Sequence, residues 1–114
     1  MTENELITAL QQCPEQVAFA DAIAVIDANY EFTPTAFTNG GLTNEAGQNT
    51  GSCKIFAFGQ LHQLTPDQTL GCFGEHYRSV LLDLAGDSHQ NIRHFMQHGW
   101  AGIEYQGQAL TAKR

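Results

Sequence analysis

The 114-residue chain carries 12 acidic and 5 basic residues, a formal net charge of −7, and 42% of its residues are hydrophobic. This length fits a single domain, residues 1–114, that can bury a core without disulfides. The shortage of positive charge argues against nucleic acid and against an anionic membrane as partners.

Cysteine usage and the N-terminal residues indicate the compartment. Cys13, Cys53 and Cys72 are too few and too odd a set for a disulfide framework, which favours a reducing, cytoplasmic location. The segment MTENELITALQQ has no basic region followed by an apolar one, and no run approaches ~20 apolar residues. We therefore expect neither a Sec signal nor a membrane-spanning helix.

The first thirty residues predict two helices. Thr2 and Glu5 have the spacing of a capping box, and the helix that they open would end before Pro14. Pro14 fits the first turn of a second helix through residue 30. Its apolar residues repeat at helical spacing on one face. They are Phe19, Ile23, Ile26 and Tyr30.

Residues 31–51 change character, because Gly and Asn become frequent. FTPTAF is typical of a short strand, and Asn39-Gly40 is a hairpin turn signal. A loop of this length in a compact domain is either functional or contains short strands. The following segment, SCKIFAFGQLHQL, predicts a helix capped by Ser52, with strand alternation an alternative as far as Phe58.

The second half of the chain is mainly helical in pattern. Thr65-Pro66-Asp67-Gln68 is typical of a helix start, and the long helix that follows is expected to end near Gly86. Its apolar face is expected in the core. That face comprises Leu70, Phe73, Tyr77, Val80, Leu81 and Leu84.

Asp87 or Ser88 is the expected cap of a last helix over residues 89–98, which Gly99 ends. GIEYQGQAL then predicts a hairpin around Gln106-Gly107, or one strand and a turn. The fold class is therefore α+β, mainly α, with four to five helices. A small antiparallel β element is expected from residues near 32–44 and 102–110.

Three short patterns resemble chemical motifs without matching their context. CFGEHYRS has the spacing of a phosphatase loop, but it lies inside the predicted long helix, where Cys72 and His76 fall on the expected solvated face. His94 and His98 are spaced for a metal, yet no further ligand is near them in sequence. GQNTGSCK is no P-loop, because Ser and Cys separate its second Gly from Lys54. We assign no metal and no cofactor.

Three long segments carry a family resemblance that covers roughly Pro14 to Thr111. DANYEFTPTAFTNGGLTNEAGQNTGSCKIFAFGQL, TLGCFGEHYR and DSHQNIRHFMQHGWAGIEYQGQAL closely resemble the HopJ type III effector family. The resemblance implies a bacterial protein with one HopJ-like domain. The family name comes from a plant-pathogen protein delivered by type III secretion. The resemblance implies no catalytic residue.

The leading hypothesis is a non-enzymatic binding or interaction domain. Its ligand surface would be the polar loop 39–54, with the polar cluster at the start of the last helix facing it. The candidate residues are Asn39, Asn44, Asn49, Ser52, Cys53, Lys54, His89, Asn91 and Arg93. Lys54 and Arg93 would meet a small anionic or amide-bearing ligand or a protein partner, and the asparagines would orient it.

Two other functions remain open at this point. One is a secreted effector that acts on a host protein, although the N-terminal residues predict a capped helix rather than an unstructured secretion signal. The other is an enzyme with a Cys53 thiolate and His89 or His62 as base, because a helix start and Lys54 both lower a thiol pKa. A Cys53 that faced the core would instead be a packing residue.

Overall fold

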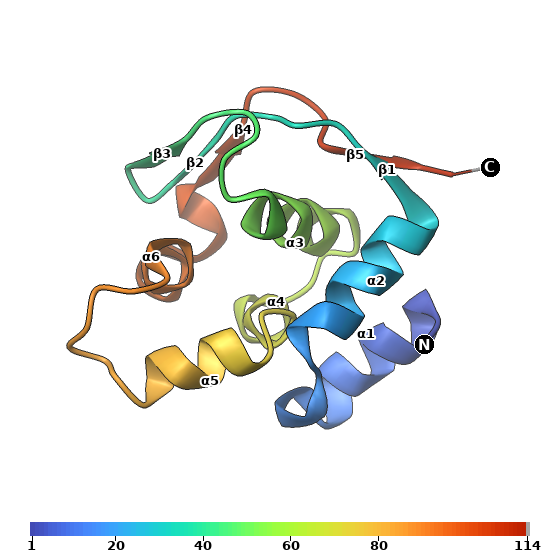
Figure 1. The fold of residues 1–114 in the computed structure, drawn as a ribbon, viewed down its shortest axis with the longest axis horizontal. Helices are drawn as coiled ribbons and strands as arrows, with labels where there is room; N and C mark the ends of the chain where they lie inside the picture. Colours follow the sequence, from blue (N-terminus) through green and yellow to red (C-terminus); the bar gives the residue numbers. More distant parts are fainter. Residues whose placement is uncertain (114) are drawn as a thin grey trace.

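The computed structural model describes residues 1–113, and within them the chain forms six α-helices and five short strands (Figure 1). The α-helices are α1 (Glu3–Gln12), α2 (Phe19–Asn29), α3 (Thr50–Leu61), α4 (Pro66–Gly71), α5 (Glu75–Leu81) and α6 (Gln90–His98). The strands are β1 (Tyr30–Phe32), β2 (Phe37–Asn39), β3 (Leu42–Asn44), β4 (Ile103–Tyr105) and β5 (Leu110–Ala112). Two 3-10 helices cover Pro14–Gln16 and Gly99–Gly102. The mainly helical α+β class is confirmed.

The strands form two small antiparallel sheets along one edge of the molecule, at the top of Figure 1. One sheet has the order β3-β2-β4 and the other pairs β1 with β5. The turn predicted at Asn39-Gly40 joins β2 to β3, where Gly40 and Gly41 have φ of 58° and 90°. Because β4 and β5 lie in different sheets, residues 102–110 form a strand and a turn rather than a hairpin.

The long helix expected from Thr65 is two helices, because the chain breaks at Gly74. This glycine has a φ of 58°, and a Cβ there would collide with the main-chain nitrogen of Phe19. Glycine alone allows this close approach. The break explains why the number of helices exceeds the expected four to five. It also buries Cys72 completely, contrary to the expectation of a solvated face.

The second predicted helix divides in a similar way. Pro14 begins a 3-10 turn, Val17 and Ala18 are extended, and α2 starts only at Phe19. None of the helices in residues 1–113 is long and apolar enough to cross a membrane.

Helix α3 lies in the middle of the helical part of the molecule and carries the centre of the core (Figure 1). Its Phe56 ring lies 4.8 Å from the ring of Phe95 on α6 and 5.5 Å from that of Phe73, in the turn between α4 and α5. Such aromatic contacts stabilise beyond the area that they bury. The core therefore fixes the starts of α3, α5 and α6 relative to one another.

Candidate functional site

A pocket of about 350 Å³ opens between the first turns of α3 and α6. Its lining residues come from helices α2, α3, α5 and α6, from strand β3 and from the turns beside them. They are Phe19, Leu42, Thr43, Asn44, Asn49, Gly51, Ser52, Phe73, His76, His89, Gln90, Asn91 and Ile92. Five of the nine candidate residues from the sequence line this one pocket, which are Asn44, Asn49, Ser52, His89 and Asn91.

Four asparagines join in one hydrogen-bonded network at the wall of the pocket. Asn91 Oδ1 accepts from Nδ2 of Asn39 and of Asn44, each at 3.1 Å, and Asn91 Nδ2 donates to Asn44 Oδ1 at 2.9 Å. Asn49 Nδ2 donates to the same Asn44 oxygen at 2.6 Å. Asn39, Asn44 and Asn91 are all buried. The network therefore ties α6 to strands β2 and β3 and to the start of α3.

Asn39 supports the pocket from behind and is not part of its lining. Its Nδ2 also donates to the main-chain oxygen of Asn91 at 2.8 Å. Its own Oδ1 is the one buried side-chain N or O atom without a partner in residues 1–113. The expectation that Asn39 contacts a ligand directly is therefore corrected, because the residue is fully buried beneath Asn91.

The helices that begin at the pocket both start without a side-chain cap. Their N-cap residues, Asn49 and His89, have left-handed φ of 50° and 51°. The first N–H groups of an α-helix have no acceptor within it, and residues 1–113 offer none to the main chain of Thr50–Ser52 or Gln90–Ile92. Two helix N-termini, whose dipoles favour negative charge, thus line one pocket.

The caps predicted for these two helices were wrong. Ser52 lies in the first turn of α3 rather than at its N-cap, and α6 begins after His89 rather than after Asp87 or Ser88. Both N-caps are left-handed, and within residues 1–113 no side chain forms a cap bond at either start.

Two imidazoles stand side by side in the pocket. The ring centroids of His76 and His89 are 5.0 Å apart, and His76 also packs edge-on against Phe19 at 4.8 Å. His76 is a pocket residue that the sequence pattern does not indicate, because the break at Gly74 has no periodic signal. No Lys or Arg belongs to the described lining, so a ligand charge would be met by main-chain dipoles and imidazoles.

Cys53 faces away from the pocket and into the core. It is 1% exposed, its Sγ lies 3.5 Å from the main-chain oxygen of Thr35, and Tyr105 Oη donates to its main-chain oxygen at 2.6 Å. Burial raises the pKa of the Cys53 thiol. This is the reverse of activation, so the structure contradicts both the thiolate enzyme and Cys53 as a ligand contact.

The two cations expected at the ligand are held elsewhere. Lys54 Nζ pairs with Asp27 at 2.8 Å and lies 5.1 Å from the centre of the Phe32 ring. Arg93 donates to the main-chain oxygens of Ser88 and Leu84 and lines a different hollow. Both residues point away from the pocket because nearer acceptors satisfy them, which corrects their assignment as ligand contacts.

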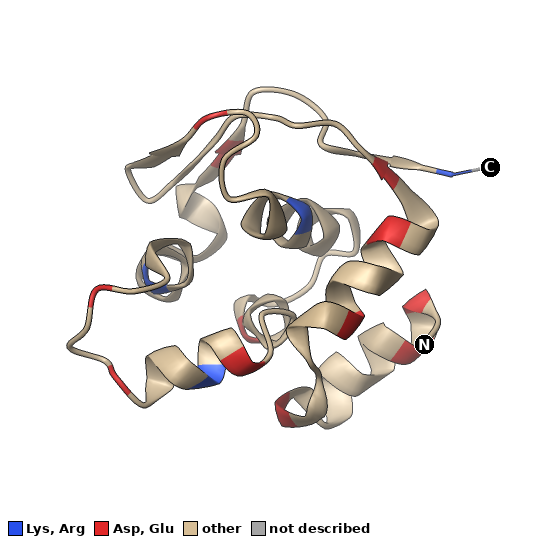
Figure 2. Cartoon of the chain, viewed as in Figure 1, with Lys and Arg blue, Asp and Glu red and all other residues tan. Residues whose placement is uncertain are grey.

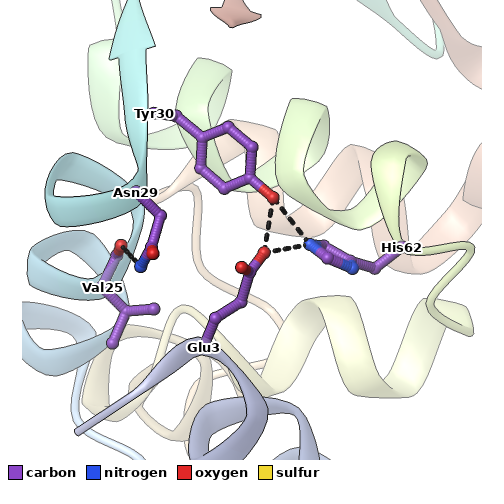
Figure 3. A network of polar contacts seen from close by, with 5 residues as sticks. All are labelled: Glu3, Val25, Asn29, Tyr30 and His62. Carbon is purple, nitrogen blue, oxygen red and sulfur yellow. Dashed lines mark hydrogen bonds and ion pairs between the residues drawn. The ribbon is translucent and has the colours of Figure 1, made fainter. Parts of the chain in front are cut away.

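His62, the second base considered for an enzyme, belongs to a separate polar cluster (Figure 3). Its Nε2 lies 3.0 Å from Tyr30 Oη, and Glu3 contacts both side chains. Burial, and then the hydrogen bond to Glu3, raise the pKa of Tyr30. The cluster ties α1 to the ends of α2 and α3.

Elsewhere, His94 Nδ1 lies 3.3 Å from the main-chain oxygen of Gly40, and residues 1–113 hold no group of three metal-ligating side chains.

Comparison with known proteins identifies close structural kin. The family described as HopJ type III effector protein matches residues 3–110. None of the curated proteins matches the sequence. A solved structure titled "Crystal structure of unknown function protein VPA0580" is 52% identical, with a TM-score of 0.96, and the match covers 99% of this chain and 95% of that one. The fold described above therefore extends to that protein over nearly its whole length.

Proposed function

The chain belongs to the HopJ type III effector family, and we propose that its domain is a non-enzymatic binding module for a small anionic or amide-bearing ligand. The observation that carries this proposal is the convergence of two uncapped helix starts, those of α3 and α6, on one pocket. Free main-chain N–H groups at helix starts are donors for carboxylate, phosphate and amide oxygens.

The character of the lining supports a small, partly flat ligand. The volume of about 350 Å³ lies near the lower end of small-molecule sites, roughly 300–1,000 Å³. Phe19 and Phe73 form an apolar part of the lining, and the amides of Gln90 and Asn49 can donate or accept. The buried asparagine network would hold these groups in place before the ligand arrives, which reduces the entropy lost on binding.

The burial of Cys53 favours binding over thiol chemistry. A nucleophile at the start of α3 would need an exposed, acidified thiol, whereas Cys53 lies in the core with a raised pKa. The described pocket lining contributes two hydroxyls, amides and imidazoles, and no cysteine belongs to it.

A thermal-shift screen of small carboxylates, phosphates and amides, followed by a ¹⁵N NMR titration of the best compound, tests the proposal. Ser52→Asp should weaken an anionic compound about tenfold by repulsion, while an acid in the first turn of α3 keeps the helix stable. Asn4→Asp is the matched control, because it adds the same charge to the first turn of α1, away from the pocket. Binding that maps elsewhere, or binding of an anionic compound that Ser52→Asp leaves unchanged, would refute the site.

A second candidate function is export to a host cell, which the family membership favours. In that role the domain would act on a host protein. A reporter fused to the full chain and expressed in a bacterium with a type III system tests delivery. Transfer that needs an intact secretion apparatus supports export, and no transfer removes this candidate.

A further inference from the structure

A cluster of apolar side chains is exposed where α5 ends and meets α6. Leu82, Leu84, Leu81 and Met96 are 90%, 67%, 45% and 37% exposed, and we call these four residues the leucine face. Neighbouring Val80, by contrast, is 1% exposed and belongs to the core. Leu84 and Met96 line one hollow of the surface and Leu81 lines another, and exposed apolar side chains gathered in this way mark an interaction site.

The leucine face is open because of the break at Gly74. A continuous helix from Thr65 would have turned Leu81 and Leu84 toward the core, as their periodicity predicts. Helix α5 is instead a short separate helix, and only Val80 near its end is fully buried. This segment therefore contains more apolar side chains than the fold buries.

The protein surface has a hollow on each side of α5. One hollow of about 310 Å³ is lined by Val80, Leu84 and Met96, together with Arg93. The other, of about 190 Å³, is lined by Leu81 with Tyr77, Pro14 and two carboxylates. Hollows of this size accept apolar side chains of a partner, as in complexes where an amphipathic helix lies in a groove.

Charge around the leucine face is predominantly negative. Asp83 and Asp87 lie in the connection between α5 and α6, where Figure 2 shows acidic positions, and Glu15 and Asp67 line the smaller hollow. None of these four carboxylates forms an ion pair within residues 1–113.

Among residues 1–113, the cations beside the two hollows are Arg78 and Arg93, and both guanidinium groups are hydrogen-bonded to the main chain. Arg78 Nη1 donates to the main-chain oxygen of Val17 at 3.2 Å, and Arg93 Nη1 donates to that of Leu84 at 3.2 Å. The rim therefore has four carboxylates against two guanidinium groups.

We propose that the leucine face docks a protein partner through a short amphipathic segment whose apolar residues are flanked by Lys or Arg. Apolar side chains of that segment fill the two hollows, and its cations face the unpaired carboxylates. A second copy of this chain is disfavoured, because its own acidic rim would face the first in a chain of net charge −7. This surface is distinct from the pocket between α3 and α6, so the two proposals stand or fall separately.

Two synthetic helical peptides of about 14 residues test the proposal, one of Leu and Lys and one with Glu in place of every Lys. In ¹⁵N NMR titrations of the full chain, the Leu–Lys peptide should bind about tenfold tighter than the Leu–Glu peptide. Its shifts should fall on the end of α5, the 82–87 connection and α6. Equal binding of both peptides, or shifts spread over all acidic surfaces, would overturn the proposal.

Matched variants separate this surface from general charge attraction. The double variant Leu82→Gln, Leu84→Gln should weaken the Leu–Lys peptide about tenfold and stay folded, because both side chains are exposed. Leu61→Gln is the control, because Leu61 is 53% exposed at the end of α3, outside the leucine face. Equal weakening by the control, or a dimer in analytical ultracentrifugation that the double variant dissolves, contradicts a basic partner.

Discussion

Helices α1 and α4 begin with closed caps, and their starts differ in kind from those at the pocket. In α1, Thr2 Oγ1 accepts from the N–H of Glu5 at 3.1 Å, and Glu5 Oε1 accepts from the N–H of Thr2 at 2.8 Å. Thr65 and Gln68 repeat the arrangement in α4 at 3.1 and 3.0 Å. Each capping box satisfies two main-chain donors within its own first turn, which no side chain does at the starts of α3 and α6 within residues 1–113.

The start of α6 is held by residues far away in the sequence instead, and the N-cap Asn49 of α3 joins the same network through Asn44. Asn91, in the first turn of α6, is hydrogen-bonded to Asn39 and Asn44, which precede it by 52 and 47 residues. Side chains that elsewhere would cap a helix here fasten it to a sheet, and the main-chain donors stay free. A helix start with a side-chain cap therefore serves the structure, whereas a start that is held by hydrogen bonds to other elements keeps its main-chain N–H groups for a ligand.

The largest expected effect comes from breaking the network that holds the open starts. Asn91→Ala removes the side-chain oxygen that accepts from Asn39 and Asn44 and the amide that donates to Asn44 Oδ1, which should lower the free energy of unfolding by about 2–3 kcal/mol. Gln90→Ala is the control, because its side chain is exposed on the same turn, and it should cost about 0.5 kcal/mol or less. Urea unfolding followed by circular dichroism measures both. Similar losses in the two variants would mean that the network does not hold α6.

The same contrast explains what the sequence could predict. Both capping boxes follow from residues three apart, so Thr2 with Glu5 and Thr65 with Gln68 are confirmed. The hairpin of β2 and β3 around Gly40 also follows from local turn and strand signals. These elements form through contacts between residues that are close in the sequence, so their pattern can be recognised in the sequence itself.

Features that depend on contacts between distant segments could not be predicted from the sequence. The break at Gly74 exists because Phe19 approaches it from another helix, and it moves both His76 and the leucine face. Lys54 and Cys53 follow Ser52 directly but leave the pocket, since one turn of helix divides neighbours between wall, surface and core. Polar loop residues could be gathered into one candidate site, but the direction of each side chain could not be predicted.

Glycine at an uncapped helix start and glycine at a capped helix start should change the free energy of unfolding in opposite directions. At His89 the backbone is left-handed, so His89→Gly removes strain, and this gain exceeds the cost of the greater entropy that glycine gives the unfolded chain. The free energy of unfolding should rise by about 0.5 kcal/mol. Thr65→Gly removes a closed cap without relieving strain and should lower it by a few tenths. Paired urea titrations measure both variants. Changes of the same sign would contradict the distinction between the two starts.

The smallest expected effect is a pH dependence of stability that the cap of α1 has and the cap of α4 lacks. Hydrogen bonds from the main chain and hydroxyl of Thr2 hold the pKa of Glu5 below its ordinary value of 4.5. A lowered carboxyl pKa stabilises the fold fully above the unfolded value, and this contribution is lost as pH falls through the folded value. The gap in melting temperature between the wild type and Glu5→Gln should therefore be present at pH 6 and close below about pH 4.

The cap of α4 offers the reciprocal experiment, because Gln68 occupies the position that Glu5 has in α1 and does not titrate. Gln68→Glu should acquire the acid-sensitive stabilisation that Glu5→Gln loses, with the same sign and over the same pH range. A gap that stayed constant from pH 6 to pH 3 in either pair would show that the carboxylate adds no charge-dependent term to the cap. The titration would then reflect groups outside the helix starts.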